Sequence, residues 1–198
     1  MLPILFLLAL SGCSTQAAEY QLMFDNPEIF SPCLDGLPGS IDFTEAFDLD
    51  NMIFDEDEEG IHISGNLTTK WDLPGTERIS ARFRIMQFDR GSWQPTLLNQ
   101  HLPDICSMMW DTKSTWYKHW FQNVVNREEI PKNCLSTKGT VWVYKPFIMS
   151  LRLGNVGNPN LRGRYKVVYS LEAFDENNER RPTSVCFEMR GVVEKMQY

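Results

Sequence analysis

The sequence predicts a mostly β protein, folded as a single-domain β-sandwich or β-cup with one short helix. Several segments alternate apolar and polar residues with a period of two, as strands with one buried face do. Turn-forming residues separate these segments at roughly the 8–12-residue spacing that is typical of sandwiches and barrels. Only one segment has the period of an α-helix. No internal repeat or linker-like stretch interrupts the chain, so one domain over residues 19–198 accounts for it.

Four segments, 61–71, 79–85, 165–172 and 185–194, alternate most clearly. Each carries apolar side chains on one face and polar ones on the other, so each is expected to be half-buried. The inward sets are Ile61, Ile63, Leu67 and Trp71; Ile79, Ala81, Phe83 and Ile85; Tyr165, Val167, Tyr169 and Leu171; and Val185, Phe187, Met189 and Val193.

Two further strands are less regular. Residues 139–153 are rich in apolar and aromatic side chains, but Lys145-Pro146 interrupts the alternation, which indicates a bulge or an edge strand. Residues 49–54 form a shorter candidate. Turns are predicted at Arg90-Gly91 and at 175–178, and the total is about eight strands.

The helical segment covers residues 114–126. Its apolar side chains recur at i, i+4, i+5 and i+8, Ser114 is a suitable N-cap, and Pro131 prevents continuation. The apolar positions are Trp116, Trp120, Phe121 and Val124.

The N-terminus has the pattern of a secretory signal peptide over residues 1–18. An apolar run over 1–10 precedes small residues, and cleavage is expected after Ala17 or Ala18. This predicts a secreted, extracellular protein. Two alternatives remain: a buried N-terminal element, and a lipoprotein signal in which Leu10-Ser11-Gly12-Cys13 leads to acylation of Cys13. No later apolar run is long enough to cross a bilayer, so we expect no stable membrane insertion.

Removal of the leader leaves four cysteines, Cys33, Cys106, Cys134 and Cys186. Secretion allows disulfides, and three pairings are formally open. The alternation places Cys186 on the outer face of its sheet, where it could hold an N-terminal segment through Cys33. A bridge between Cys106 and Cys134 would clamp the ends of the helical segment. The sequon Asn66-Leu67-Thr68 puts a candidate N-glycosylation site on the polar face of its strand.

The composition narrows the function classes. Hydrophobic residues make up 42% of the chain and charged residues 23%, which is enough for a packed core. The formal net charge is −7, so the protein has no long-range attraction for nucleic acid or anionic lipid surfaces. We exclude both as primary partners.

No catalytic, cofactor or metal motif stands out. The sequence lacks GxSxG, HExxH and a phosphate-binding glycine loop, and it has three His and no CxxC, so no structural zinc is expected. The acidic run 55–59 does not have the ligand spacing of an EF-hand and is interpreted as a solvated turn. We therefore expect no enzyme and no cofactor, although a pair of carboxylates that hydrolyses glycosides stays open.

The aromatic residues are the part of the composition that bears most on function. Phe, Trp and Tyr make up 12% of the chain, with six Trp. Trp110, Trp116, Tyr117, Trp120 and Phe121 crowd one short stretch, with Met108 and Met109 beside them. Such large and adaptable side chains suit a pocket for irregular apolar ligands, but they also suit a filled core.

Three stretches resemble a known family. They are Phe88-Asp89-Arg90-Gly91-Ser92-Trp93-Gln94-Pro95-Thr96; Leu161-Arg162-Gly163-Arg164-Tyr165-Lys166; and Glu172-Ala173-Phe174-Asp175 with Arg180-Arg181-Pro182-Thr183-Ser184-Val185-Cys186-Phe187-Glu188. Together with residues 55–66 and the Trp116-Tyr117 segment, they resemble the insect CheB chemosensory proteins. These are similar in turn to the GM2 activator branch of the MD-2-related lipid-recognition proteins. The resemblance covers nearly the whole mature chain.

This resemblance implies a β-cup around an apolar cavity, secretion near gustatory sensilla, and a role in sensing lipid-like contact pheromones or cuticular hydrocarbons. It implies cooperation with a chemosensory ion channel or receptor rather than turnover of a substrate, and it removes the lipoprotein alternative. The GM2 activator has more disulfides than this chain can form, and the retained pairs are expected to be Cys33–Cys186 and Cys106–Cys134.

From the inward strand positions and the apolar face of the helix, we expect the cavity to be lined by Phe83, Ile85, Trp116, Trp120, Phe147, Met149, Tyr169 and Phe187. The alternative is a secreted interaction protein with a filled core, which modulates a receptor or ion channel without binding a small ligand. A secreted hydrolase with an unrecognised acidic pair is a third hypothesis.

Overall fold

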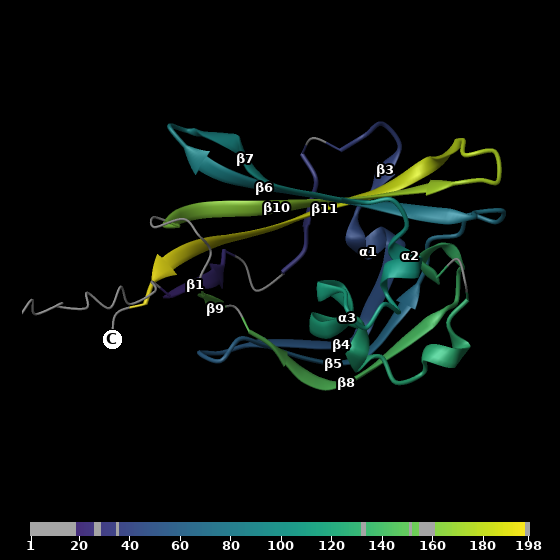
Figure 1. Cartoon of the computed structure of the whole chain (residues 1–198), viewed down its shortest axis with the longest axis horizontal. Helices are drawn as coiled ribbons and strands as arrows, with labels where there is room; N and C mark the ends of the chain where they lie inside the picture. Colours follow the sequence, from purple (N-terminus) through teal and green to yellow (C-terminus); the bar gives the residue numbers. More distant parts are fainter. Residues whose placement is uncertain are drawn as a thin grey trace, which may run out of the picture.

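Two β-sheets packed face to face form the molecule (Figure 1). The computed structural model describes residues 19–25, 29–34, 36–131, 134–150, 152–154 and 161–196. The predicted signal peptide over residues 1–18 lies outside them. No helix within these ranges is long and apolar enough to cross a membrane. The prediction of a mostly β sandwich is confirmed, but several short helices take the place of the single helix that was expected.

The larger sheet has the strand order β7-β6-β10-β11-β1-β9, with β2 and β3 also paired to β11. Its long strands are antiparallel, and β3 pairs with β11 in parallel. The strands are β1 (Glu19–Phe24), β2 (Ser31–Pro32), β3 (Ser40–Ile41), β6 (Arg78–Asp89), β7 (Ser92–Leu102), β9 (Arg152–Gly154), β10 (Gly163–Phe174) and β11 (Arg180–Lys195).

The smaller sheet contains β4 (Phe47–Glu56), β5 (Ile61–Thr69) and β8 (Val141–Met149), in the order β4-β5-β8. Strand β8 is an edge strand, and its pairing with β5 shifts by one residue across Lys145-Pro146. Proline has no N–H to give to a ladder, so the chain bulges there, as the sequence predicted.

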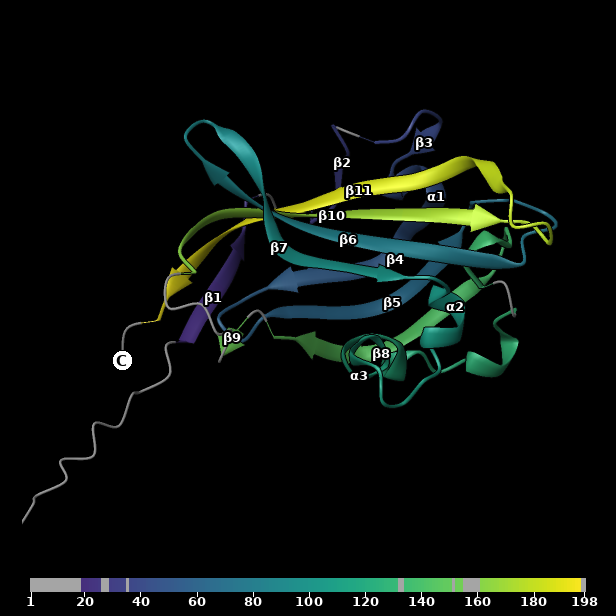
Figure 2. The same ribbon diagram turned by 45° about the horizontal axis from the view of Figure 1, so that its top comes forward.

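Short helices fill the space between and beside the sheets. Helix α1 (Phe43–Ala46) contacts both β4 and β11, and α2 (Ile105–Met108) contacts β6. The turned view shows α2 and α3 beside β8 (Figure 2). The remaining elements are α3 (Thr115–His119), η1 (Phe121–Asn123), η2 (Arg127–Glu129) and η3 (Cys134–Ser136).

The helical segment is shorter than predicted. Ser114 caps α3 by accepting from the Tyr117 N–H at 3.0 Å, but the α-helix ends at His119. Beyond η1 the chain becomes extended, and Val124 forms a β-bridge with Tyr144 of β8. The side-chain amide of Asn126 also bonds the β8 backbone at Val141 and Val143. The prediction of a helix to residue 126 was therefore wrong. The backbone after η1 forms hydrogen bonds with the free edge of β8 instead of continuing the helix.

Two disulfides join distant parts of the chain. Cys33 is bonded to Cys186 over a separation of 153 residues, and Cys106 is bonded to Cys134 over 28 residues. The first holds the N-terminal segment to β11, and the second encloses α3 and its continuation. Both predicted pairings are present.

A buried ionic cluster ties the N-terminal segment to the larger sheet. The Glu188 carboxylate accepts from Lys166 Nζ at 2.9 Å, from Arg190 Nη2 at 2.7 Å, and from the Leu34 N–H at 3.3 Å. Lys166 and Glu188 are almost fully buried. Burial alone raises the pKa of Glu188, but the hydrogen bonds from Lys166 and Arg190 outweigh it and hold this pKa below its ordinary value.

Asn66 lies on the exposed face of β5, opposite the packed side chain of Leu67. When the chain is expressed through the secretory pathway of eukaryotic cells, we expect it to carry an N-glycan there, because the Asn66 side chain is exposed. Enzymatic deglycosylation should lower the intact mass by one glycan, and an Asn66→Gln variant should have the lower mass from the start. A wild-type mass equal to that of the bare polypeptide would contradict this expectation.

Candidate functional site

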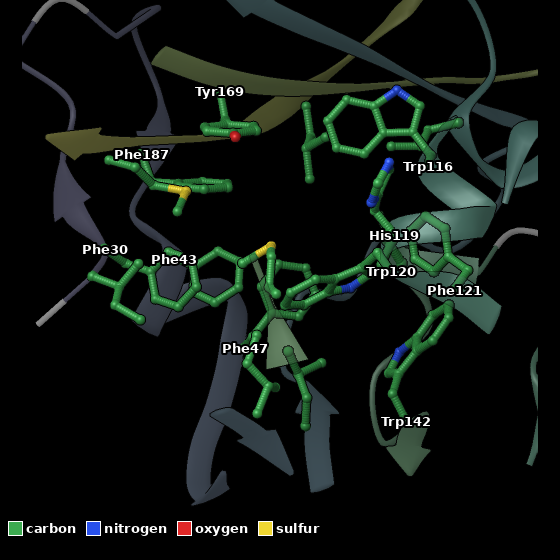
Figure 3. A pocket seen from close by; sticks show the side chains of 18 of the residues that line it. Phe30, Phe43, Phe47, Trp116, His119, Trp120, Phe121, Trp142, Tyr169 and Phe187 are labelled. Atoms are coloured by element: carbon green, nitrogen blue, oxygen red, sulfur yellow. The ribbon is translucent and has the colours of Figure 1, made fainter. Parts of the chain in front are cut away.

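An apolar cavity of about 210 Å³ lies between the two sheets and is partly open to solvent (Figure 3). Its volume exceeds the roughly 150 Å³ of an engineered apolar cavity that binds benzene. Both sheets, the short helices and the N-terminal segment contribute to its wall.

The larger sheet contributes an aromatic row. Phe83 of β6, Tyr169 of β10 and Phe187 of β11 are cross-strand partners, so their rings lie side by side on the inner face. Tyr169 stacks on Phe187 with 4.7 Å between ring centroids, and it meets Phe83 edge-on at 5.0 Å. Trp116 of α3 extends the row by stacking on Phe83 at 4.3 Å.

The N-terminal segment closes the other end of this row. Phe30 stacks on Phe43 at 4.0 Å, and Phe43 lies 4.7 Å from the Phe187 ring. Phe43 is held at the start of α1 by a capping box, in which the Asp42 carboxylate accepts from the Glu45 N–H and the Glu45 carboxylate accepts from the Asp42 N–H. Figure 3 shows Phe30 and Phe43 on one side of the cavity and Trp116 and His119 on the opposite side.

The smaller sheet and the segment after α3 form the facing wall. Trp120, the C-cap residue that follows α3, has its ring centroid 5.5 Å from that of Tyr144. Burial raises the pKa of the Tyr144 hydroxyl, and the hydrogen bond with Trp120 only partly offsets this. The side chains on this wall include Phe47, Phe54, Ile63, Leu67, Trp120, Phe121, Trp142, Tyr144 and Met149.

Most of the residues expected from the sequence border this cavity. Six of them do so in the structure: Phe83, Trp116, Trp120, Met149, Tyr169 and Phe187. The expectation was wrong for Ile85 and Phe147. Ile85 lies where β6 leaves the buried interior, since Ile85 and the next two residues are only half-buried and the last two residues of the strand are exposed. Phe147 packs against Trp120 and Tyr144, which line the cavity in its place.

Sequence reasoning missed the lining that comes from short elements. Ile29 and Phe30 lie in a segment with no periodicity, and Ile105 and Leu135 belong to helices of one turn or less. The short helix that carries Phe43 could have been predicted, because Asp42 and Glu45 have the spacing of a capping box at a helix start. His119 was not among the residues expected to line the cavity, yet it borders the cavity while remaining exposed.

The acidic run forms the turn between β4 and β5. Asp57 accepts from the backbone N–H of Glu59 at 2.7 Å and pairs with His62 Nε2 at 2.7 Å. The hydrogen bond from the Glu59 N–H is the main reason why the pKa of Asp57 lies below its ordinary value, and the hydrogen bond with His62 lowers this pKa further. These bonds order a solvated hairpin tip. In the part of the chain that the structure describes, no group of three or more His, Cys, Asp or Glu side chains could hold a metal ion.

No protein-family model and no curated protein matches this sequence. The aromatic cavity is therefore the feature from which function has to be argued.

Proposed function

We propose that this protein is a secreted binder of a hydrophobic ligand. The observation that carries the proposal is the cavity of about 210 Å³, whose wall is almost entirely apolar and aromatic. Apolar surface removed from water contributes roughly 25 cal/mol per Å², so a matching ligand gains affinity from burial alone. A filled core, as in the alternative hypothesis, leaves no such space.

The disulfides and the sequence pattern of the leader support an extracellular setting for this ligand. The resemblance to the insect CheB proteins suggests the class of ligand and the biological role. The ligand is a lipid-like contact pheromone or cuticular hydrocarbon, and the protein acts in gustatory chemosensation beside an ion channel or receptor.

A first experiment isolates the natural ligand. The protein is secreted from eukaryotic cells, weighed intact by native mass spectrometry, and extracted with solvent. We expect an added mass that denaturation releases as a long-chain lipid or hydrocarbon. A protein that stays ligand-free even after exposure to lipids and hydrocarbons would refute the proposal.

Replacement of Trp120 by alanine should weaken ligand binding by at least tenfold without unfolding the protein. Trp120 is half-buried and faces the cavity, and a buried aromatic side chain contributes roughly 1.5–3 kcal/mol. Fluorescence titration with the extracted ligand measures the change.

Trp93→Ala is the matched control for this variant. Trp93 is also half-buried, but it lies near Lys166 and does not border the cavity. Its loss should leave ligand affinity unchanged. Unfolding of the Trp120 variant, or equal affinities in the two variants, would place Trp120 in the structural core instead.

A specific surface feature supports a second role beside ligand binding, in which the protein contacts a receptor or channel. In β7 the pairing with β6 is interrupted between Pro95 and Asn99, and this bulge leaves Leu97 fully exposed and Leu98 mostly exposed. The two adjacent leucines give this bulge a small apolar surface that a protein partner would cover on binding. Loss of receptor response in a Leu97→Ser/Leu98→Ser variant that still binds ligand would support this second role.

A further inference from the structure

The outer face of β6, opposite the cavity, carries two exposed arginines. Phe83 borders the cavity, so its neighbours Arg82 and Arg84 lie on the other face of the strand, and both are exposed. Across the ladder they face His101 and Asn99 of the edge strand β7, which are exposed as well. Arg82, Arg84, Asn99 and His101 therefore form one polar surface open to solvent, called here the outer patch.

The two arginines of the outer patch are not neutralised within the molecule. Neither Arg82 nor Arg84 forms an ion pair with an acidic residue in the part of the chain that the structure describes. On the next two strands of the sheet, Glu172 and Glu188 share this face, but each already pairs with another cation. Two positive charges are therefore free for an external anion, although the chain as a whole has a formal net charge of −7.

Apolar side chains flank the outer patch on the same hairpin. Phe88 lies on the same face of β6 as Arg84, is 39% exposed, and meets the Trp93 ring edge-on with 5.2 Å between centroids. Leu97 is fully exposed and Leu98 is 55% exposed in the bulge of β7 that precedes Asn99. Arginine and aromatic residues are the types enriched where protein interfaces gain most of their energy, so this combination is typical of a protein-binding surface.

The position of the β6–β7 hairpin leaves it accessible to a partner. Its turn projects from the body of the molecule in both views (Figure 1 and Figure 2), and β7 is the last strand of its sheet among the described residues. The glycan expected at Asn66 would lie on the smaller sheet instead. Pro95 and the bulge interrupt the free edge of β7, so a partner would bind through side chains rather than by adding a strand.

The chemistry of the outer patch fits carboxylates. A guanidinium binds a carboxylate through two parallel hydrogen bonds. Arg82 and Arg84 are two residues apart in one strand, a spacing of roughly 6.8 Å, and an extended segment with acidic residues at alternate positions has the same spacing. The net charge opposes large polyanions and anionic membranes, but salt screens it beyond about 8 Å, so a short segment that touches only the patch avoids most of the repulsion.

We propose that the outer patch binds a short acidic segment of a protein partner. Carboxylates of the partner pair with Arg82 and Arg84, and an apolar side chain of the partner covers Phe88 and Leu97. This inference rests on the second role proposed above, contact with a receptor or channel, and specifies the chemistry of the surface that is contacted. It does not depend on what the cavity holds, because the patch and the cavity lie on opposite faces of β6.

The test selects binders from a random peptide library displayed on phage, with the full-length secreted protein as the target. We expect the enriched peptides to carry acidic residues at alternate positions next to an apolar residue. An Arg82→Glu/Arg84→Glu variant should bind these peptides at least tenfold more weakly, and high salt should weaken wild-type binding as well. Enriched peptides without acidic residues, or equal affinities of variant and wild type, would overturn the proposal. If the Glu variant does not fold, Arg82→Gln/Arg84→Gln decides.

A matched control is Lys145→Glu/Arg152→Glu. It changes the net charge by the same amount, at two exposed residues that lie on β8 and β9 rather than on the β6–β7 hairpin. This variant should keep the wild-type affinity for the acidic peptides. An equal loss in both variants would reflect net charge alone and overturn a local site. Binding to phosphatidylcholine–phosphatidylserine vesicles that needs Arg82 and Arg84, without any acidic peptide, would replace the protein partner by a lipid surface.

A fluorescent apolar probe keeps the two proposals apart. Because Arg82 and Arg84 face away from the cavity, their substitution should leave binding of this probe unchanged. A protein that binds the probe but selects no acidic peptides would overturn the outer patch and leave the hydrophobic carrier. A protein that selects acidic peptides through the two arginines but binds no apolar compound would overturn the carrier and leave the patch.

Discussion

Replacing Glu188 with alanine is expected to lower the free energy of unfolding by about 3–5 kcal/mol. The substitution leaves Lys166 buried without its counter-charge, and the Leu34 N–H loses its acceptor. Breaking a buried pair from one side is strongly destabilising because the remaining charge cannot regain water. Urea denaturation of the two proteins measures the difference.

A paired substitution separates the ion pair from simple packing. Lys166→Met with Glu188→Leu removes both buried charges and keeps comparable volume, so it should recover most of the lost stability. Arg190, which is partly exposed, can turn its guanidinium to solvent. A single variant that loses less than about 1 kcal/mol, or a double variant no better than the single, would contradict the account.

The same cluster gives stability a pH dependence. The folded pKa of Glu188 lies below the unfolded value of about 4.5, so its contribution is present above that value. It is lost as the pH falls through the folded pKa. The Glu188→Ala variant should therefore lose less stability than the wild type on acidification below about pH 4.5.

Removal of the Cys33–Cys186 disulfide, by alanine at both positions, is expected to destabilise the protein by roughly 4–5 kcal/mol. A bridge over 153 residues removes more freedom from the unfolded chain than one over 28 residues. The Cys106–Cys134 variant should accordingly lose less, about 3–4 kcal/mol. Thermal unfolding of both variants under oxidising conditions makes the comparison.

The two bridges should also differ in their effect on the cavity. Cys33 follows Phe30 by three residues, so breaking the disulfide at Cys33 loosens the segment that brings Phe30 to the cavity wall. We expect the Cys33→Ala/Cys186→Ala variant to be cleaved by protease near residues 25–40 at temperatures where it is still folded. Resistance equal to that of the wild type would show that β2 and Glu188 suffice to hold the segment.

The sequence predicted the inner face of the larger sheet but not its register. Phe83, Tyr169 and Phe187 were each assigned inward because alternation along a strand has only two phases. That they form one continuous row depends on which residues pair across β6, β10 and β11, and no single strand carries that information. The row became visible only in the folded molecule.

Predictions from local sequence patterns failed where a neighbouring strand bound the same segment of the chain. Val124 fits the apolar face of a helix, yet the edge of β8 offers hydrogen bonds to the same backbone and takes it. Phe147 has an inward phase, but Trp120 and Tyr144 occupy the space in front of it. Ile29 and Phe30 carry no pattern, because they lie outside any strand, just before the two-residue strand β2.

The cavity also affects the folding stability of the protein and, through it, the lifetime of the protein. Side chains leave about 210 Å³ of the interior unfilled, and at about 24 cal/mol per Å³ this forgoes roughly 5 kcal/mol of packing. For a fold of ordinary marginal stability, that is a large share of the total. Any molecule that fills the space shifts the equilibrium away from unfolded forms that proteases and quality control remove. For the proposed carrier, abundance in an extracellular fluid would then follow the supply of its ligand.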